Sequence, residues 1–539
     1  MKMKKYLMYA LGIALLGTVG ACENPLKDFN LLVSTEVIKN SATLEVLDFD
    51  GNAVNATIKL ASGDIADVYN LEGKKEFKLA GNLVSFGLDP KRVPTSSAPV
   101  TFQVEISAAG YTTQIVPVTI TNINTGIQAV RLVKPSSLPE GATSVDKVAN
   151  LNNDGSLATA TVVHVEDAKN DIDVTVTIPA GVKFMDAAGN VLTGNAVSIR
   201  VIGFDAESAS GLTLFPGGRL QATGVQLNGG ATGVGTFDPA ATTNVVMNVN
   251  GVEVRQFSQP ISIAMGLDPA FKFDDGSAVQ AGKSLELYSY ANADGFWKYE
   301  SSPAITGSDV AGYDVVFTTS HLTTFCNGQF IKSCAPISEI NISADWLGQG
   351  LTYPIVVDAV RHGAVIASRQ FSVSQTSNVL GFDYLPASNV TYVFRNLTTG
   401  VEIARVAQAN CGSQTHVTLP NPNPVIEAKV TLQLYVRCPD KTDPITLLPT
   451  FQLYYRVSGS GSTFNYLGEV TNGFLQTTLL KSNGTKYDFQ AVYKNRVKTV
   501  NNKTLNADNS GTVGIKPGDI IGEKAGANNL AILTEECGK

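Results

Sequence analysis

The feature that most constrains this chain is its repeated short runs of alternating apolar and polar residues, which begin at residue 31. The runs are rich in Val, Ile, Thr, Tyr and Phe, and turn-forming residues separate them, while helical periodicity is nearly absent. Such alternation puts one face of a strand in a core and the other in water. Regularly spaced strands without intervening helices predict an all-β chain of tandem antiparallel β-sandwiches. Clear examples are residues 101–106, 173–178, 431–436 and 451–455.

Length and composition limit the classes of protein that remain. A chain of 539 residues predicts several domains rather than one. With 44% hydrophobic and 16% charged residues, the chain is too apolar and too weakly charged to be disordered. The formal net charge is −7, which argues against a broad surface for nucleic acid, so we expect no nucleic-acid partner.

Proline-containing spacers divide the chain into its predicted parts. They lie at 134–141, 333–336 and 420–424, and proline stiffens such spacers towards an extended form. We predict four sandwich domains after a signal peptide (1–21) and a tether (22–30), with these boundaries: 31–134, 142–332, 335–420 and 425–539.

The first 22 residues predict export from the cytoplasm. Lys2, Lys4 and Lys5 precede an apolar run at 6–16, and the run ends in small residues and Cys22. The run is too short to span a bilayer comfortably, so we interpret it as a cleavable signal peptide. Residues 19–22, Val-Gly-Ala-Cys, resemble a bacterial lipobox, which implies that the Cys22 thiol receives a diacylglycerol and anchors the mature chain. The alternative is an ordinary signal peptide with an incidental cysteine.

The lipobox resemblance also implies a location. Glu23, rather than Asp, follows the cysteine, which in lipoproteins favours the outer membrane. The polar stretch 23–28 resembles the surface-export signals of Bacteroidetes lipoproteins. We therefore expect a palmitate-type lipid anchor in the outer membrane and display at the cell surface, with the periplasmic face as the alternative. No other segment reaches 18 uninterrupted apolar residues, so we expect no membrane-spanning helix.

The remaining cysteines fit an exported protein that forms disulfides. They are odd in number, so at least one stays unpaired, and they lie late in the chain: Cys326, Cys334, Cys411, Cys438 and Cys537. None forms a Cys-x-x-Cys pair, which argues against zinc. We predict a bridge between Cys326 and Cys334, which flank a short polar loop, and a second bridge between two of the other three. Reduced, buried cysteines are the alternative.

Local motifs suggest families for three of the predicted domains. An Asp-x-x-Gly-Asn hairpin at 48–52 and Ala-Gly-Tyr at 109–111 resemble carboxypeptidase-regulatory-like sandwiches. A second such hairpin at 186–190, then Trp297 in a hairpin and His321 in a late strand, resemble extracellular domains of cartilage-intermediate-layer and ZU5 type. We interpret Trp297 and His321 as packing residues. The third domain, 335–420, is predicted to be Ig-like from alternation alone.

The last domain has the most specific motif. Residues 480–492 resemble the fibronectin type III segment that carries a tyrosine corner, with the corner at Tyr487. By period two, Phe489 and Ala491 share the side of Tyr487, which places this tyrosine on the core face. The resemblance implies that its hydroxyl bonds to the backbone a few residues upstream. A tryptophan expected in the second strand of that fold is absent.

Motifs for catalysis or cofactor binding were not found. The four histidines are scattered singly, and there is neither His-Glu-x-x-His nor Gly-x-Ser-x-Gly. Gly282-Lys283-Ser284 lacks the glycine spacing of a P-loop. Asp48 begins an EF-hand-like run, but Ala53 and Lys59 occupy its required Gly and Glu positions. We expect no cofactor, with a looser calcium site at 48–52 or 506–511 left open.

Two function classes remain. The favoured class is a non-enzymatic, surface-displayed lipoprotein whose tandem sandwiches act as a stalk, a structural module or a binding module for a glycan or protein ligand. The alternative is an exported glycan-active enzyme with accessory β-domains, since a pair of catalytic carboxylates needs only spatial proximity. The identity of the ligand is not encoded in any motif of the sequence.

Overall fold

The computed structural model describes residues 31–34, 38–291, 295–348, 350–411, 413–422, 430–434, 436–437, 445–505 and 508–513. Almost all regular structure in these ranges is β-strand, and they contain no α-helix, which confirms the predicted all-β fold class. Short 3₁₀ segments interrupt the strands at η1 (Ile65–Asp67), η2 (Gly211–Leu214) and η3 (Pro216–Gly218).

The chain forms two compact units. The large unit comprises Ile38–Ile426 together with Lys494–Lys498. The small unit contains the described residues before Ile38 and those after Glu427, apart from Lys494–Lys498. The finer division into four domains stays a prediction.

The first core of the large unit lies between two sheets built from residues 41–132. Apolar side chains at alternate strand positions, such as Leu44, Val104 and Val118, fill the space between the sheets. One sheet has the order β3-β6-β7, and the other carries β8-β2-β5-β4. The strands are β2 (Ser41–Asp48), β3 (Thr57–Gly63), β4 (Val68–Tyr69), β5 (Leu83–Leu88), β6 (Val100–Ser107), β7 (Gln114–Ile120) and β8 (Ile127–Leu132).

A second core lies between two larger sheets, with orders β10-β11-β17-β21-β20 and β14-β19-β18-β22-β15-β13-β9, while β12 and β16 pair at their sides. Side chains such as Val176, Met247 and Phe325 fill it. The strands are β9 (Ala142–Asn150), β10 (Thr161–Asp167), β11 (Ile172–Ile178), β12 (Phe184–Met185), β13 (Ala196–Phe204), β14 (Gln221–Gln226), β15 (Thr232–Val249), β16 (Val252–Glu253), β17 (Gln256–Gly266), β18 (Glu286–Ala291), β19 (Phe296–Ser301), β20 (Ile305–Ser308), β21 (Gly312–His321) and β22 (Thr324–Lys332).

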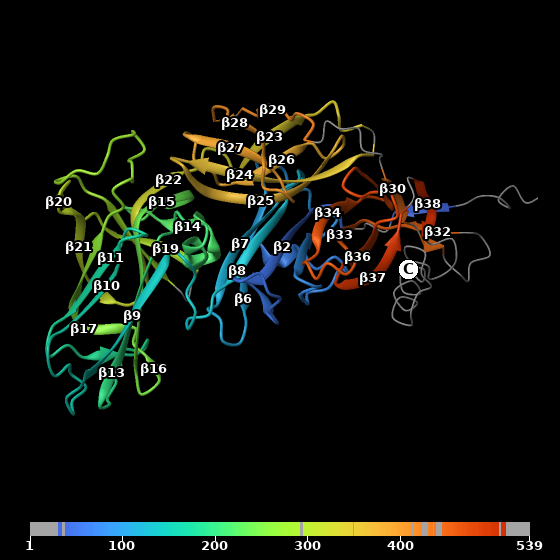
Figure 1. Ribbon diagram of the computed structural model, residues 1–539. Helices are drawn as coiled ribbons and strands as arrows, with labels where there is room; N and C mark the ends of the chain where they lie inside the picture. The colour runs from blue at the N-terminus through green and yellow to red at the C-terminus, as the bar shows by residue number, and fades with distance from the viewer. Residues whose placement is uncertain are drawn as a thin grey trace, which may run out of the picture. The chain divides into compact units, whose positions relative to one another are not determined.

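The rest of the large unit contains two further layers of strands, β26-β23-β29 and β28-β27-β24-β25. The two layers lie next to each other in Figure 1. Ring contacts of Phe382 with Phe371 and Tyr392, with centroids 5.7 Å apart in each pair, join the two layers. Gln370 of β25 pairs with Ile127 of β8, so one eight-stranded sheet runs from β28 to β4. The strands are β23 (Ile337–Ser343), β24 (Thr352–Arg361), β25 (Ala364–Ser374), β26 (Val379–Asp383), β27 (Val390–Asn396), β28 (Glu402–Ala407) and β29 (Thr415–Thr418).

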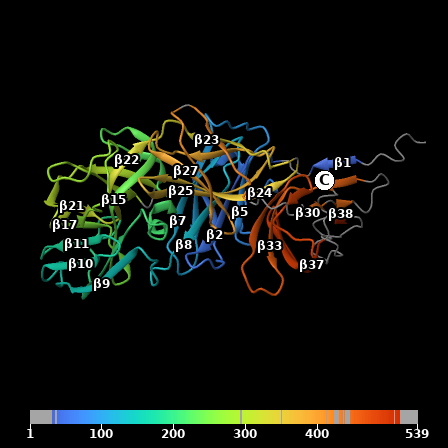
Figure 2. The ribbon, with the colours of Figure 1, turned by 45° about the horizontal axis from the view of Figure 1, so that its top comes forward.

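The small unit contains the sheets β34-β33-β36-β37, β35-β30-β38 and β1-β32-β31 (Figure 2). Its core includes Leu432, Leu453 and Phe489. The strands are β1 (Leu31–Ser34), β30 (Val430–Leu434), β31 (Val436–Arg437), β32 (Ile445–Leu448), β33 (Phe451–Val457), β34 (Asn465–Val470), β35 (Phe474–Thr477), β36 (Lys486–Tyr493), β37 (Arg496–Thr504) and β38 (Asp508–Val513).

Candidate functional site

A buried charged cluster, here called the buried triad, consists of Arg219, Arg369 and Asp383. Arg219 follows η3, Arg369 lies on β25 and Asp383 ends β26. Their side chains are 5–7% exposed. Nη2 of Arg219 lies 2.7 Å from Oδ2 of Asp383, and Nη2 of Arg369 lies 3.1 Å from Oδ1. Each carboxylate oxygen therefore accepts a charge-assisted hydrogen bond from a different guanidinium. Neither oxygen of Asp383 is left free to take up a proton from a substrate.

The electrostatics of the triad favour the charged state. Burial alone raises the pKa of Asp383, but Arg219 and Arg369 outweigh this effect and hold the pKa below its ordinary value of 3.8. Burial lowers the pKa of Arg369 to about 10, so this guanidinium is still protonated at neutral pH. The triad is therefore an ionised group inside the protein, and its net charge is positive.

Polar neighbours connect the triad to distant parts of the sequence. Thr119 of β7 donates to Asp383 Oδ2 at 3.2 Å, and Gln128 of β8 accepts from Arg219 at 3.3 Å. The next residue, Tyr384, has a φ of +57°, its hydroxyl lies 2.6 Å from that of Thr101, and its carbonyl accepts from Thr236 at 2.8 Å. Residues of three predicted domains thus meet at one buried polar junction.

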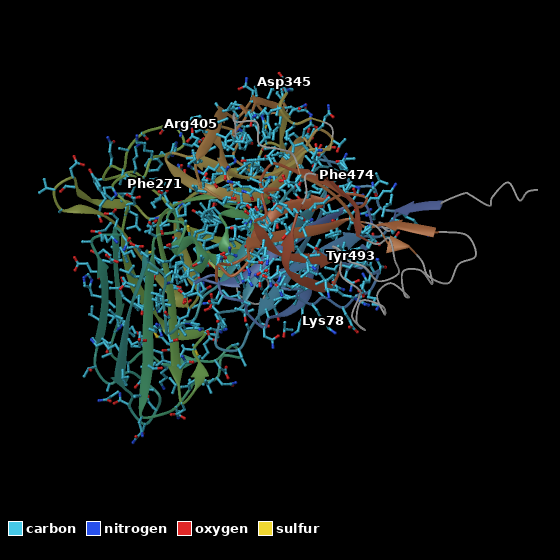
Figure 3. The ribbon with its side chains drawn as sticks, turned by 45° about the vertical axis from the view of Figure 1, so that its right-hand side comes forward. Lys78, Phe271, Asp345, Arg405, Phe474 and Tyr493 are labelled. Carbon is cyan, nitrogen blue, oxygen red and sulfur yellow. A yellow bond between two sulfur atoms is a disulfide. The ribbon has the colours of Figure 1, made fainter. Side chains whose placement is uncertain are left out.

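Arg361, at the end of β24, forms a second buried connection and is 1% exposed. Its Nε lies 3.1 Å from Asp238 Oδ2, and its Nη2 lies 3.0 Å from Asp274 Oδ1. For comparison, Arg405 on β28 pairs with Glu402 at 2.7 Å, but Arg405 is 63% exposed and lies at the surface (Figure 3). Arg361 therefore joins residues of the second and third predicted domains through the buried Asp238 and the half-exposed Asp274.

Our sequence reasoning missed both buried connections, although a signal for them was present. Arg369 lies in phase with buried Ala367 and Phe371 along β25, and Arg361 lies in phase with buried Ala359 along β24. A charged residue on the apolar face of an alternating strand needs a buried partner, because an unpaired charge is costly in a core. The pattern reveals the need for a partner but does not identify the partner.

A groove of about 510 Å³ lies beside the disulfide between Cys334 and Cys411, and we call it the disulfide groove. Eight of its fifteen lining residues have uncharged hydrogen-bonding side chains, and Gln414 donates to the one carboxylate in the lining, Glu339, at 2.6 Å. Both cysteines of this disulfide are exposed. Its volume lies within the usual range for ligand pockets. The lining residues are Ser96, Ser97, Cys334, Ala335, Pro336, Ile337, Ser338, Glu339, Gln408, Ala409, Asn410, Cys411, Ser413, Gln414 and Thr415.

The predicted pairing of Cys326 with Cys334 is wrong. Cys334 is bonded to Cys411, with Cα atoms 5.8 Å apart, while Cys326 is free and buried. The physical reason is that Cys326 lies near the start of β22, which extends to Lys332. A strand rises about 3.3 Å per residue, so these cysteines are too far apart to bond. Cys22, Cys438 and Cys537 lie outside the described residues.

A small acidic cavity of about 110 Å³ lies in the second core region, where Asp205, Glu207 and Asp268 contribute to its lining. Burial raises the pKa of Glu207 to about 8, and the nearby carboxylates of Asp238, Asp268 and Asp205 add to the rise. Burial also raises the pKa of Asp268. The cavity thus holds a carboxyl group that is largely protonated at neutral pH. The volume of the cavity, however, is well below that of a usual ligand pocket.

The Asp-x-x-Gly-Asn hairpins use their carboxylates to hold the turn. Asp48 Oδ1 accepts from the Asn52 backbone at 2.7 Å, and Oδ2 accepts from the Asn52 side chain and the Tyr111 hydroxyl. Asp186 contacts Asn190 in the same way. Within the described ranges, no group of three or more acidic, Cys or His side chains is arranged to hold a metal ion. Part of the other suggested calcium loop, 506–511, lies outside those ranges.

The residues predicted to be structural are buried or partly buried. Trp297 is 2% exposed and its ring stacks on Phe215 with centroids 4.9 Å apart. His321 ends β21, its ring lies 5.7 Å from that of Phe325, and its Nε2 lies 3.6 Å from Glu300. Tyr487 is 3% exposed, and its hydroxyl accepts the backbone N–H of Lys481 at 3.0 Å, six residues upstream. This is the bond that the sequence predicts for a tyrosine corner.

Comparisons with known proteins identify no family for this chain. No protein-family description matches it, and no curated protein matches it. Among solved structures, it is similar to the major pilin subunit of Bacillus cereus, with 10% identity, a TM-score of 0.13, and coverage of 71% of this chain and 99% of the pilin. It is also similar to the Bacillus anthracis TIE protein, with 10% identity, a TM-score of 0.14, and coverage of 84% and 75%. At these scores neither similarity bears on function. No helix within the described ranges is long and apolar enough to cross a membrane.

Proposed function

We propose that this protein is a non-enzymatic lipoprotein of the bacterial outer membrane, anchored through Cys22 and displayed at the cell surface. The resemblance of residues 19–22 to a lipobox supports the anchor, and Glu23 supports the outer membrane. Its β-sandwiches act as a rigid scaffold that carries a binding surface. By resemblance the first sandwich is carboxypeptidase-regulatory-like, the second is of cartilage-intermediate-layer or ZU5 type, and the last is fibronectin type III-like.

The observation that carries this proposal is that buried charged side chains connect strands that are distant in the sequence. Asp383 binds two arginines at 2.7 and 3.1 Å, and Arg361 binds two aspartates at 3.1 and 3.0 Å. A catalytic acid or base needs access to substrate and a free proton site, and Asp383, which is buried with both oxygens bonded to arginines, offers neither. The buried charged side chains do fix the relative positions of distant strands, which suits a protein that must present a surface in a constant orientation.

The disulfide groove is the best supported binding surface on this scaffold. Its uncharged polar side chains, including Asn410 and Ser413, match a neutral polar ligand such as a glycan or a polar peptide segment. The disulfide limits the movement of the residues around Cys411, which lowers the entropic cost of binding.

The anchor is tested by replacing the lipidated cysteine. With Cys22→Ser, we expect loss of fatty-acid labelling and accumulation of unprocessed precursor or release of the protein. Cys326→Ser is the matched control, because Cys326 is buried and away from the signal sequence. If the Cys22→Ser protein is still processed to its mature form and still partitions into detergent, the proposed lipid anchor is refuted. Protease treatment of intact cells then separates surface display from the periplasmic face.

Binding is tested at the groove itself. The soluble mature chain and its Asn410→Ala/Gln414→Ala variant would be applied to a glycan array and to a peptide array. We expect one ligand class to bind the unaltered chain and to lose at least about tenfold in affinity in the variant, which corresponds to about 1.4 kcal/mol. Equal binding by both chains would exclude the groove as the binding surface.

The acidic cavity supports a second candidate, an exported glycan-active enzyme. Glu207, whose pKa burial raises to about 8, has the protonation state of a general acid at neutral pH. The small volume of the cavity speaks against a sugar substrate. Hydrolysis of a glycan panel by the unaltered chain, abolished in Glu207→Gln, would favour the enzyme and displace the first proposal.

A further inference from the structure

Residues 31–34, which follow the predicted tether, form a strand of the small unit. In β1, Leu31 to Ser34 pair in parallel with Ile445 to Leu448 of β32, residue by residue. β1, which is labelled in Figure 2, is one of the two edge strands of the sheet β1-β32-β31. The sequence predicts residue 31 as the start of the first domain, yet its backbone pairs with the last predicted domain. The first strand of the large unit, β2, begins only at Ser41.

The distance along the chain between the proposed lipid and this strand is short. Nine residue steps separate Cys22 from Leu31. An extended chain covers at most about 3.3–3.6 Å per residue, so β1 begins no more than about 32 Å from the lipidated cysteine. The strand β32, which pairs with β1, is therefore held close to the bilayer surface.

We infer that the C-terminal module, by which we mean the described residues of the small unit after Glu427, is held directly at the membrane, rather than the first domain. It is held there by the addition of β1 to β32. This inference rests on the proposed lipid anchor at Cys22, whereas the pairing of β1 with β32 does not. In a simple string of domains the last domain would instead be the part farthest from the anchor along the chain.

The pairing also assigns a role to residues 31–34. Main-chain hydrogen bonds from an added edge strand supply affinity without a specific side-chain pocket. The pairing is parallel, so β1 and β32 run in the same direction, and the large unit begins further along the chain, at Ile38. The tether is thereby connected to the C-terminal module by a backbone ladder as well as to the large unit by the chain.

The pairing is tested first without any lipid. A soluble chain that begins at residue 23 would be compared with its Leu32→Pro/Val33→Pro variant, because proline cannot donate to a strand ladder. We expect backbone amides in 445–448 to exchange with deuterium at least about tenfold faster in the variant, which is the effect of losing roughly 1.4 kcal/mol of protection. Asp28→Pro/Phe29→Pro, which lies in the tether just before β1, is the matched control and should leave this exchange unchanged. Equal exchange in all three chains would overturn the pairing.

Membrane retention is tested next on the lipidated protein. A site for a sequence-specific protease would be inserted at Asn423, in the spacer before the last predicted domain. After cleavage, we expect the C-terminal fragment to stay in the membrane pellet in the unaltered chain and in the Asp28→Pro/Phe29→Pro control. We expect its release in the Leu32→Pro/Val33→Pro variant.

The outcomes separate the two proposals. Release of the fragment from the unaltered chain, or retention in both proline variants, would overturn membrane holding by β1. If the intact protein is already soluble before cleavage, the lipid anchor fails, and the exchange experiment still decides the pairing. Each result therefore bears on one proposal at a time.

Discussion

Replacing Asp383 with Asn removes one negative charge, preserves the shape of the side chain, and leaves Arg219 and Arg369 buried without a counter-ion. In the native chain the two guanidiniums lie 2.7 and 3.1 Å from the carboxylate oxygens, and all three side chains are at most 7% exposed. Breaking a buried ion pair by removing one partner typically costs 3–5 kcal/mol, because the remaining charge stays desolvated. Two charges lose their partner here, so we expect a loss of about 3–5 kcal/mol or more in the unfolding free energy of the large unit.

The assay is equilibrium urea unfolding of the soluble mature chain, followed by tryptophan fluorescence. Both tryptophans of the chain, Trp297 and Trp346, lie in the large unit, so the signal reports on that unit. Glu402→Gln is the matched control: it removes one carboxylate charge from a pair with equally short contacts, but at the surface, where ion pairs contribute little. If Asp383→Asn shifts the unfolding midpoint no more than Glu402→Gln does, the triad does not stabilise the large unit by connecting its distant strands.

The pH dependence gives an independent check on the same group. The pKa of Asp383 is lower in the folded chain than its ordinary value of 3.8. A carboxyl group with a lowered folded-state pKa contributes stability above its unfolded pKa, and this contribution is lost as pH falls through the folded-state pKa. We therefore expect the stability difference between the native chain and Asp383→Asn to be full above about pH 5 and to shrink below about pH 4.

Three further predictions concern other residues. Tyr487→Phe removes only the bond from the Lys481 N–H, so we expect a loss of about 1–3 kcal/mol in the small unit and faster exchange of the Lys481 amide; an unchanged amide would contradict the corner. Cys334→Ser/Cys411→Ser should cost about 2–4 kcal/mol, since the bridge closes a separation of 77 residues, and peptide mapping of the native chain should find Cys326 unalkylated until denaturation. Glu207 has a folded-state pKa raised to about 8, so stability should fall as pH rises from about 4.5 to 8. Glu207→Gln should flatten that slope and be more stable than the native chain by about 4 kcal/mol at pH 8, and a slope as steep as the native one would refute the assignment.

The elements that sequence alone predicted are those whose signal is local. Alternation in β11 and β33 needs only a strand and one covered face, and both strands lie where the pattern indicates. The bond to Tyr487 spans six residues, so a motif of similar length carries the information. The turn at Asp48 is equally local, because Asn52 is four residues away, whereas the bond from Tyr111 spans 63 positions and is not part of the turn.

The elements that sequence could not predict depend on contacts between distant residues. Asp383 bonds Arg219 across 164 positions, and Cys334 bonds Cys411 across 77. Nothing in the spacing of the cysteines favours that pair over others, and the predicted loop closure failed because β22 is one extended strand. The pairing of β1 with β32 is a backbone match between two short runs, and many other strands in this chain would offer an equivalent edge.

The disulfide groove depends on these distant contacts as well. Ser96 and Ser97 line one part of it, whereas its other lining residues come from the stretches 334–339 and 408–415. No local element connects Ser97 to Cys334. What fixes the two parts relative to one another is the set of connections between the first and third predicted domains: the contact of Gln370 with Ile127, the bond from Thr119 to Asp383, and that between Thr101 and Tyr384. A change at the buried triad should therefore alter ligand binding in the groove even though no triad residue lines it, and Asp383→Asn should weaken binding under conditions in which the chain is still folded.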